Sequence, residues 1–452
     1  MTGLPLIIAF VIAVVLMIVA ISKFKVHPFL SIMGVSLLLA LVSDIKLGSI
    51  PGVIGAGFSG TFSSIGIVII LGAFIGSVLE VTGAALKLAD MVIKLVGKKR
   101  PELAIGLMGW VVSIPVFCDS GFVILDPIRR ALVRRTGTSS VAMTVALSCG
   151  LYISHVMIPP TPGPIAAAET LGIGENLLLV MGMGLLCSIF PLIAGLLYAK
   201  FIGKRIKSSD ETVSDGEIVK TYEELVAEYG KLPCGVNALA PLLVPVAFMA
   251  LGTIADMAEF TGFFGELLTF LGTPIIALIA GTILAIIQIG LAGKMVKFYD
   301  LANDTLKTVG PILFVTAAGG VLGKVIQNTT MIDYIKEAVP GLSAMGIFFP
   351  FLLAAILKTA QGSSTVAITT TAGIMAPMME TMGLTSPVMA ALTVMAIGAG
   401  AMTVSHANDS YFWVVTNFGK MTPQQGYKTQ TLLTLVMGVA TVIGIYLVSL
   451  CF

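Results

Sequence analysis

The most constraining feature of the chain is the stretch 114–125, where a carboxylate, Asp119, stands between Pro115 and Gly121 in an otherwise apolar run. A helix that crosses lipid has to satisfy every backbone polar group internally, so the proline and the glycine weaken the helix at this point. A charge at bilayer depth costs on the order of 2.5–3.5 kcal/mol on insertion scales and marks a path for an ion or a substrate. We therefore expect the rest of the chain to hold this charged, interrupted segment inside a membrane.

The composition predicts an all-α polytopic membrane protein. Of the 452 residues, 57% are hydrophobic and only 11% are charged, whereas a soluble chain carries about 25% charged residues. A window of about 20 residues per span gives roughly a dozen apolar segments, some too short to cross. The five cysteines form no CxxC pair, and the basic residues lie in short loops between apolar runs. We expect no metal, no cofactor and no nucleic-acid partner.

Basic residues indicate which ends of the apolar segments face the cytoplasm. Two basic clusters, at 98–100 and 129–135, flank the segment 101–132. If both clusters are cytoplasmic, this segment enters and leaves the membrane from one side. We therefore predict a re-entrant hairpin with residues 117–121 at its tip, buried in protein or lining a cavity. The alternative is one full span with a buried polar residue.

The first half also contains a broken helix, which we place at 154–164. The four prolines within Pro159–Pro164 cannot continue a helix, and they leave free carbonyl groups at or near membrane depth. A long polar stretch with charges of both signs follows at 203–237. We interpret it as a cytoplasmic linker between a first transmembrane repeat, residues 1–202, and a second repeat, residues 238–452.

The second half repeats this pattern. The apolar run 347–379 is interrupted at 358–365, and because neither flank is basic, the predicted hairpin opens to the outside. A second broken helix is predicted at 405–410. The apolar runs at 65–86 and 309–326 are predicted as ordinary spans.

Three pairs of landmarks recur at nearly the same sequence separation. These are 72–82 with 319–329, Ser154-His155 with Ser405-His406, and Asp119 with Gln361. Similar separations with opposite inferred orientations are typical of two inverted-topology repeats in secondary transporters. In such proteins the substrate and the ions bind near the midplane, at discontinuous helices.

The charges also place the two termini. Lys23 and Lys25 directly follow the first apolar segment, 4–21, which puts the N-terminus outside. The loop 420–428 is predicted to be cytoplasmic, and the last apolar segment, 432–450, then runs outward. Both termini are therefore predicted to lie outside the cell membrane, which the chain crosses several times.

Four motifs in the chain resemble those of the gluconate permease family of the ion-transporter superfamily. They are Pro-x-Phe-x-[Asp/Glu]-x-Gly-Phe-Val at 115–123, Pro-Pro-His-Pro-Gly-Pro nearly matched at 159–164, Ala-Gln-Gly-Ser-x-Thr-Val-Ala at 360–367, and Ser-His-x-Asn-Asp-Ser-x-Phe-Trp at 405–413. The resemblance covers essentially the whole chain. It implies a proton-coupled symporter of small hydroxy-carboxylates such as gluconate, with relatives that carry D-serine or other organic acids. Thr161 stands where many members have His, and Lys358 stands where gluconate carriers tend to have Arg, so both residues bear on which acid is carried.

The candidate substrate-binding residues are small or polar and lie at the interruptions. They are Ser120, Gly121, Thr161, Gly163, Lys358, Gln361, Gly362, Ser363, Ser364, Thr365 and Asn408. Hydroxyls and amides suit a polyhydroxy ligand, and half-helix N-termini would aim N–H groups at an anion. For the serines and threonines the alternative is helix capping. Lys358 could pair with the substrate, with Asp119 or with Asp409, or could reach the surface.

The candidate proton-coupling residues are Asp119, Asp409, His155 and His406. Burial favours the neutral form of a carboxyl group, which can then bind and release a proton as access alternates. The same two carboxylates could instead coordinate sodium together with unwound backbone carbonyls. The histidines could relay protons, or could hydrogen-bond the broken backbone at a helix end.

The sequence therefore predicts a symporter that takes up a small organic anion with protons by an elevator-like form of alternating access. The alternative is a sodium-coupled symporter of an organic anion or of an amino acid such as D-serine. We expect ion handling at the first hairpin tip and substrate capture at the second. A channel would need a continuous polar pore, and an intramembrane hydrolase would need a motif such as H-E-x-x-H or G-x-S-x-G, which the chain lacks. The oligomeric state is left open, with a homodimer as one option.

Overall fold

The computed structural model describes residues 1–452 except 97–99, 210–231, 259, 331–344 and 407–408. All regular secondary structure in the described residues is helical. Seven helical segments among them are long and apolar enough to cross a membrane, or up to eight if a bent pair counts as one span. The predicted all-helical membrane fold is confirmed. Most of the predicted linker, 203–237, lies outside the described residues.

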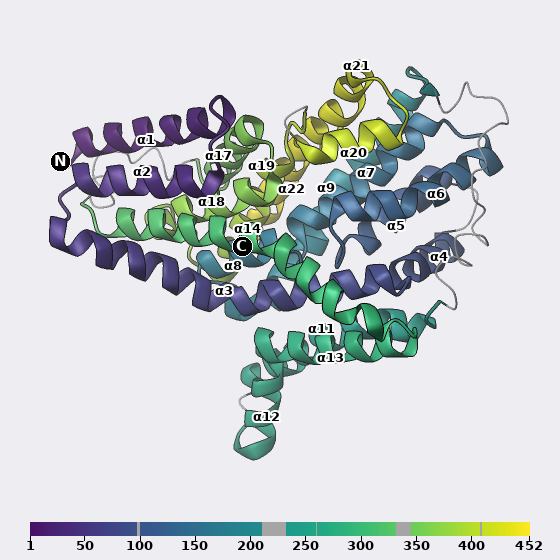
Figure 1. Ribbon diagram of the computed structural model, residues 1–452, viewed down its shortest axis with the longest axis horizontal. Helices are drawn as coiled ribbons and strands as arrows, with labels where there is room; N and C mark the ends of the chain where they lie inside the picture. The colour runs from purple at the N-terminus through teal and green to yellow at the C-terminus, as the bar shows by residue number, and fades with distance from the viewer. Residues whose placement is uncertain (97–99, 210–231, 259, 331–344, 407–408) are drawn as a thin grey trace.

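Two long antiparallel helices, α3 (Ile50–Val81) and α14 (Phe298–Gln327), pack side by side across the molecule (Figure 1). A Cβ added to Gly57 of α3 would lie 2.8 Å from the Cα of Val321 in α14, so the two backbones touch. We call these two helices and their neighbours the long-helix group. The neighbours are α1 (Leu4–Ser22), α2 (Pro28–Val42), α11 (Gly235–Met257), α12 (Gly262–Gly272) and α13 (Pro274–Leu291).

Apart from α4 (Ala84–Val96), the remaining α-helices form a second group, here called the broken-helix group. It comprises α5 (Pro101–Val112), α6 (Cys118–Thr136), α7 (Ser140–Met157), α8 (Pro162–Thr170), α9 (Leu177–Gly203), α17 (Phe348–Gln361), α18 (Ser364–Met375), α19 (Pro387–Met402), α20 (Ser410–Phe418), the short α21 (Pro423–Gly426) and α22 (Leu432–Ser449). Every described residue of α7 is buried, and so is nearly all of α19, so these two helices form the centre of the group.

The four predicted interruptions are all present. The helix ends before 113–117, 158–161, 362–363 and 403–409, and it starts again after each stretch. Gly362 ends α17 in the left-handed region at φ 91°, a conformation that favours glycine. The Ser363 side chain then caps α18 by accepting a hydrogen bond from the backbone N–H of Val366. The side of the membrane to which each hairpin opens stays a prediction.

The predicted spans at 65–86 and 309–326 differ from the helices observed. The helix α3 begins at Ile50 and ends at Val81, and the chain bends by 76° into α4 (Ala84–Val96). Gly83, at φ 76°, makes this turn possible, because the left-handed region favours glycine. The helix α14 begins at Phe298, ahead of its apolar part. In both helices a glycine-rich or polar extension lowers the local hydropathy, so a search for apolar segments in the sequence does not include the extension.

The matching glycines of the two halves lie at corresponding packing surfaces. A Cβ on Gly76 of α3 would lie 2.0 Å from the carbonyl oxygen of Pro115, at the first interruption. A Cβ on Gly323 of α14 would lie 2.7 Å from the carbonyl oxygen of Gly373 in α18. Each long helix therefore uses glycine to approach the backbone of one predicted hairpin.

Candidate functional site

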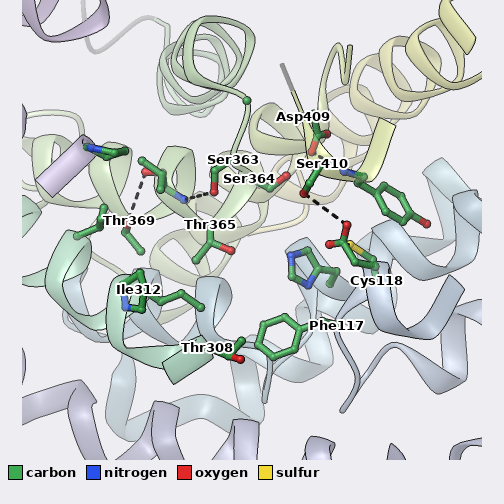
Figure 2. Close-up of a pocket in the computed structure, with 18 of the residues that line it drawn as sticks. Phe117, Cys118, Thr308, Ile312, Ser363, Ser364, Thr365, Thr369, Asp409 and Ser410 are labelled. Carbon is green, nitrogen blue, oxygen red and sulfur yellow. Dashed lines mark hydrogen bonds between the residues drawn. The ribbon is translucent and has the colours of Figure 1, made fainter. Parts of the chain in front are cut away.

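A cavity of about 530 Å³ lies where the interruptions meet the long-helix group (Figure 2). Both predicted hairpins contribute to its wall, through 117–119 on one side and 362–366 with Thr369 on the other. The remaining wall residues come from α7 (Tyr152, His155), from the start of α20 (Asp409, Ser410, Tyr411), from the start of α2 (His27, Pro28) and from α14 (Thr308, Pro311, Ile312, Val315). The site therefore combines residues from both halves of the chain.

A buried ion pair lies beside this cavity. The Lys358 Nζ is 2.7 Å from the Asp409 Oδ2, and the two side chains are 0% and 6% exposed. The same ammonium donates a hydrogen bond to the carbonyl oxygen of Gly362, at the end of α17. Asp409 in turn caps α20, because its Oδ1 accepts a hydrogen bond at 3.0 Å from the backbone N–H of Tyr411. One ion pair thus connects the interruption of the second hairpin with that of the second broken helix.

Two hydroxyl groups complete the surroundings of Asp409. Tyr152 donates a hydrogen bond of 3.3 Å to the Asp409 Oδ2, and Ser405 donates another to the same oxygen. The Tyr152 hydroxyl also lies 2.6 Å from the hydroxyl of Ser364, in the first turn of α18. Lys358 lies 5.8 Å from the centre of the Tyr152 ring, within the range of a cation–π contact. Tyr152 therefore joins α7 to both interruptions of the second half.

Asp119 has quite different surroundings. It is in the first turn of α6 and lines the cavity, and its partners are the Ser410 hydroxyl at 3.4 Å and the Cys118 thiol at 3.7 Å. Among the described residues no Lys, Arg or His nitrogen lies within 4 Å of its carboxylate. The cavity thus contains two carboxylates of different kinds: Asp409 is paired with a cation, and Asp119 is not.

The two histidines predicted for proton coupling also lie in different places. His155, in the last turn of α7, is 8% exposed and lines the cavity. His406 is outside the cavity wall, and its Nε2 is 3.0 Å from the carbonyl oxygen of Thr359. This contact of His406 with a helix carbonyl has the geometry of the helix-end alternative.

The structure brings some of the predicted substrate-binding residues together and not others. Gly362, Ser363, Ser364 and Thr365 line the cavity, and Figure 2 shows the three hydroxyl residues above Thr308 and Phe117 in this view. Residues outside its wall are Gly121, Lys358, Thr161, whose hydroxyl donates to the Ile158 carbonyl, and Gly163, which packs against Ile368. The side chains of Ser120 and Gln361 and the whole of Asn408 lie outside the described part of the chain.

Sequence reasoning missed Tyr152 and the contribution of the long-helix group. Thr144, Ser148, Tyr152 and His155 follow one another at helical spacing on a mostly apolar helix, so a polar stripe on α7 was the available signal. His27 and Thr308 carry no such signal, because only the packing of α2 and α14 brings them to the cavity. Within the described ranges no group of three His, Cys, Asp or Glu residues is arranged to hold a metal ion.

Comparisons with known proteins agree with these observations. A family model described as GntP family permease matches residues 4–451. A permease of Haemophilus influenzae is 34% identical over 427 residues, which are 92% of this chain and 86% of its own length. The low-affinity gluconate transporter of Escherichia coli K12 is 30% identical over 450 residues, or 98% of each chain.

A solved structure has a similar fold. The crystal structure of the Alcanivorax borkumensis YdaH transporter, described as having an unusual topology, matches with a TM-score of 0.64. The match covers 94% of this chain and 97% of that one at 16% identity. At this identity the likeness extends to the fold alone.

The buried ion pair gives a prediction about stability. Lys358→Met should lower the free energy of unfolding by about 3–5 kcal/mol, because it leaves the Asp409 carboxylate buried without its cation. Adding Asp409→Asn should recover part of this loss, since asparagine can still cap α20. The measurement is chemical denaturation of the purified protein in detergent.

An exposed ion pair supplies the matched control. Lys307 and Asp304 lie 2.9 Å apart with side chains 76% and 69% exposed, so Lys307→Met should cost less than about 1 kcal/mol. If Lys358→Met were no more destabilising than Lys307→Met, the buried pair would not hold the interruptions together.

Proposed function

The chain belongs to the GntP family of permeases, and from this premise we propose that it is a secondary active symporter that takes up gluconate or a related small hydroxy-carboxylate together with protons. The observation that carries the proposal is the cavity itself, which places hydroxyl groups and a helix N-terminus on one wall and, on another, an acid that has no cation beside it in the described part of the chain. The name of the Escherichia coli relative, a gluconate transporter, supports the choice of substrate.

The wall formed by the second hairpin suits a hydroxylated anion. The helix α18 is 12 residues long, and its first turn borders the cavity, so the N–H groups of Ser364 and Thr365, which the Ser363 cap leaves available, can bind a carboxylate. Hydroxyls of Ser363, Ser364 and Thr365 add donors and acceptors for the alcohol groups of the ligand. The volume of about 530 Å³ is within the range of about 300–1,000 Å³ typical of small-molecule sites.

The wall formed by the first hairpin suits a proton. Among the described residues no cation lies beside Asp119, whereas the charge of Asp409 is balanced by Lys358 at 2.7 Å. Among the described residues, the hydrogen-bond partners of Asp119 are a thiol and a hydroxyl, and a thiol is a poor ligand for a hard cation such as sodium. We therefore assign the coupling proton to Asp119, with Asp409 fixed in its ion pair.

The position of the cavity supports an elevator-like mechanism. Most of its wall belongs to the broken-helix group, and the rest is supplied by His27, Pro28 and the middle of α14. If the broken-helix group moved along α3 and α14, the cavity wall would lose its contacts with α2 and α14. The residues around Asp409 would move together, so their mutual contacts would be kept. Access would then alternate without disturbing the buried pair.

The driving force follows from charge balance. A monovalent anion that moves with one proton carries no net charge, so a pH gradient alone can drive its accumulation. Each additional positive charge that moves inward gains about 2.3 kcal/mol per 100 mV of membrane potential. Sodium coupling is the competing hypothesis, and it would make uptake depend on a sodium gradient instead.

Uptake into proteoliposomes tests this function. An imposed pH gradient without sodium should drive gluconate above its equilibrium level in the wild type. Asp119→Asn should abolish this accumulation yet keep the exchange of labelled for unlabelled substrate, because the amide cannot carry the proton. Asp304→Asn, at an exposed carboxylate, is the matched control and should accumulate normally.

Either of two results would contradict the assignment. Gluconate accumulation that requires sodium would exclude proton coupling. Normal accumulation by Asp119→Asn would remove this residue from the coupling step.

The proposed orientation can be tested with the two exposed cysteines. Cys451 is next to the C-terminus and Cys234 is at the end of the predicted cytoplasmic linker, whereas the other three cysteines are buried. In right-side-out vesicles a membrane-impermeant maleimide should label Cys451 and leave Cys234 unlabelled until the membrane is opened. Labelling of Cys234 first would reverse the proposed topology.

A further inference from the structure

His155 differs from the other two histidines of the chain in having no hydrogen-bond partner among the described residues. Its Nδ1 is buried, and neither its Nδ1 nor its Nε2 is hydrogen-bonded to any of them. By contrast, the His27 Nδ1 accepts a hydrogen bond from the backbone N–H of Phe29, and the His406 Nε2 lies 3.0 Å from a carbonyl oxygen. Buried polar groups are normally hydrogen-bonded, so the unpaired imidazole ring of His155 indicates that a further molecule supplies its hydrogen-bond partner.

The position of the ring points to a ligand as that partner. His155 is 8% exposed and lines the cavity, where its ring lies 5.9 Å from the ring of Phe117, between centroids. The other buried polar groups of this wall already have partners, since Asp409 is bound by Lys358 and Tyr152 lies against Ser364. His155 is therefore the buried polar group of the wall that is left for a bound molecule.

The burial of His155 favours a neutral imidazole, because desolvation disfavours the charged form. Among the described residues no carboxylate oxygen lies within 4 Å of the ring, so an imidazolium would have no counter-ion in direct contact. A neutral imidazole has one donor nitrogen and one acceptor nitrogen. An alcohol group can both donate and accept, so it can pair with whichever nitrogen faces it, whereas a carboxylate can only accept.

We infer that His155 binds a hydroxyl group of the substrate and makes that hydroxyl a requirement for tight binding. This inference rests on the proposed transport of a hydroxy-carboxylate, and it names the residue that distinguishes such an acid from a plain carboxylate. The carboxylate end of the substrate is held at the start of α18, and His155 forms a hydrogen bond with an alcohol group elsewhere on the same molecule. A ligand without this group leaves the buried ring unpaired, which is the strongest basis for rejecting a close analogue.

Binding of gluconate and of its singly deoxygenated analogues to the purified protein tests the inference. In the wild type, at least one analogue should bind about 10- to 100-fold more weakly than gluconate. In His155→Phe, which keeps a ring beside Phe117, gluconate should lose a similar factor, and that analogue should bind as well as gluconate. His155→Gln, which keeps an amide donor and acceptor, should restore part of the discrimination.

The comparison of two proteins with two ligands separates this effect from general damage, because damage weakens both ligands alike. The inference is overturned if His155→Phe discriminates between gluconate and every analogue as the wild type does. It is also overturned if the wild type binds all the deoxygenated analogues as tightly as gluconate. If the wild type binds and transports no hydroxy-carboxylate at all, the proposed function fails, and the inference fails with it.

Discussion

The buried ion pair between Lys358 and Asp409 is the interaction on which the site depends. Two interrupted helices meet at bilayer depth, where free backbone groups and an isolated charge would both be costly. The two charges of the pair neutralise each other, and both residues also satisfy backbone groups, because Lys358 binds the carbonyl of Gly362 and Asp409 caps α20. Tyr152 ties the same carboxylate to α7. The arrangement allows unwound backbone to persist inside an apolar protein.

The pairing also separates the roles of the two acids. With Asp409 neutralised by Lys358, Asp119 is the cavity carboxylate without a cation among the described residues. This difference in ion pairing corresponds to the asymmetry expected from the sequence, in which the first hairpin tip carries an acid and the second carries hydroxyl groups. Lys358 stands behind the second tip, where it supports the backbone and leaves the anion to the N–H groups of α18.

Much of this architecture could be predicted from sequence because it is local. Proline, glycine and isolated charges locate the four interruptions, and a helix has few ways to continue through them. The partner of Lys358 could not be predicted, since Asp119, Asp409 and the substrate were all open choices and the contact spans 51 residues. The starts of α3 and α14 were missed for a related reason, because glycines such as Gly57 serve the contact between two distant helices.

The most direct test of this account counts the protons taken up when the substrate binds. Calorimetric titration of the purified protein with gluconate, in buffers of different ionisation enthalpy, measures the number of protons taken up per bound substrate. The titration is carried out above the pH at which the coupling carboxyl group releases its proton. The account predicts proton uptake by the wild type and none by Asp119→Asn, with the Lys358–Asp409 pair intact in both. Undiminished proton uptake by Asp119→Asn would contradict it, because another group would then carry the coupling proton.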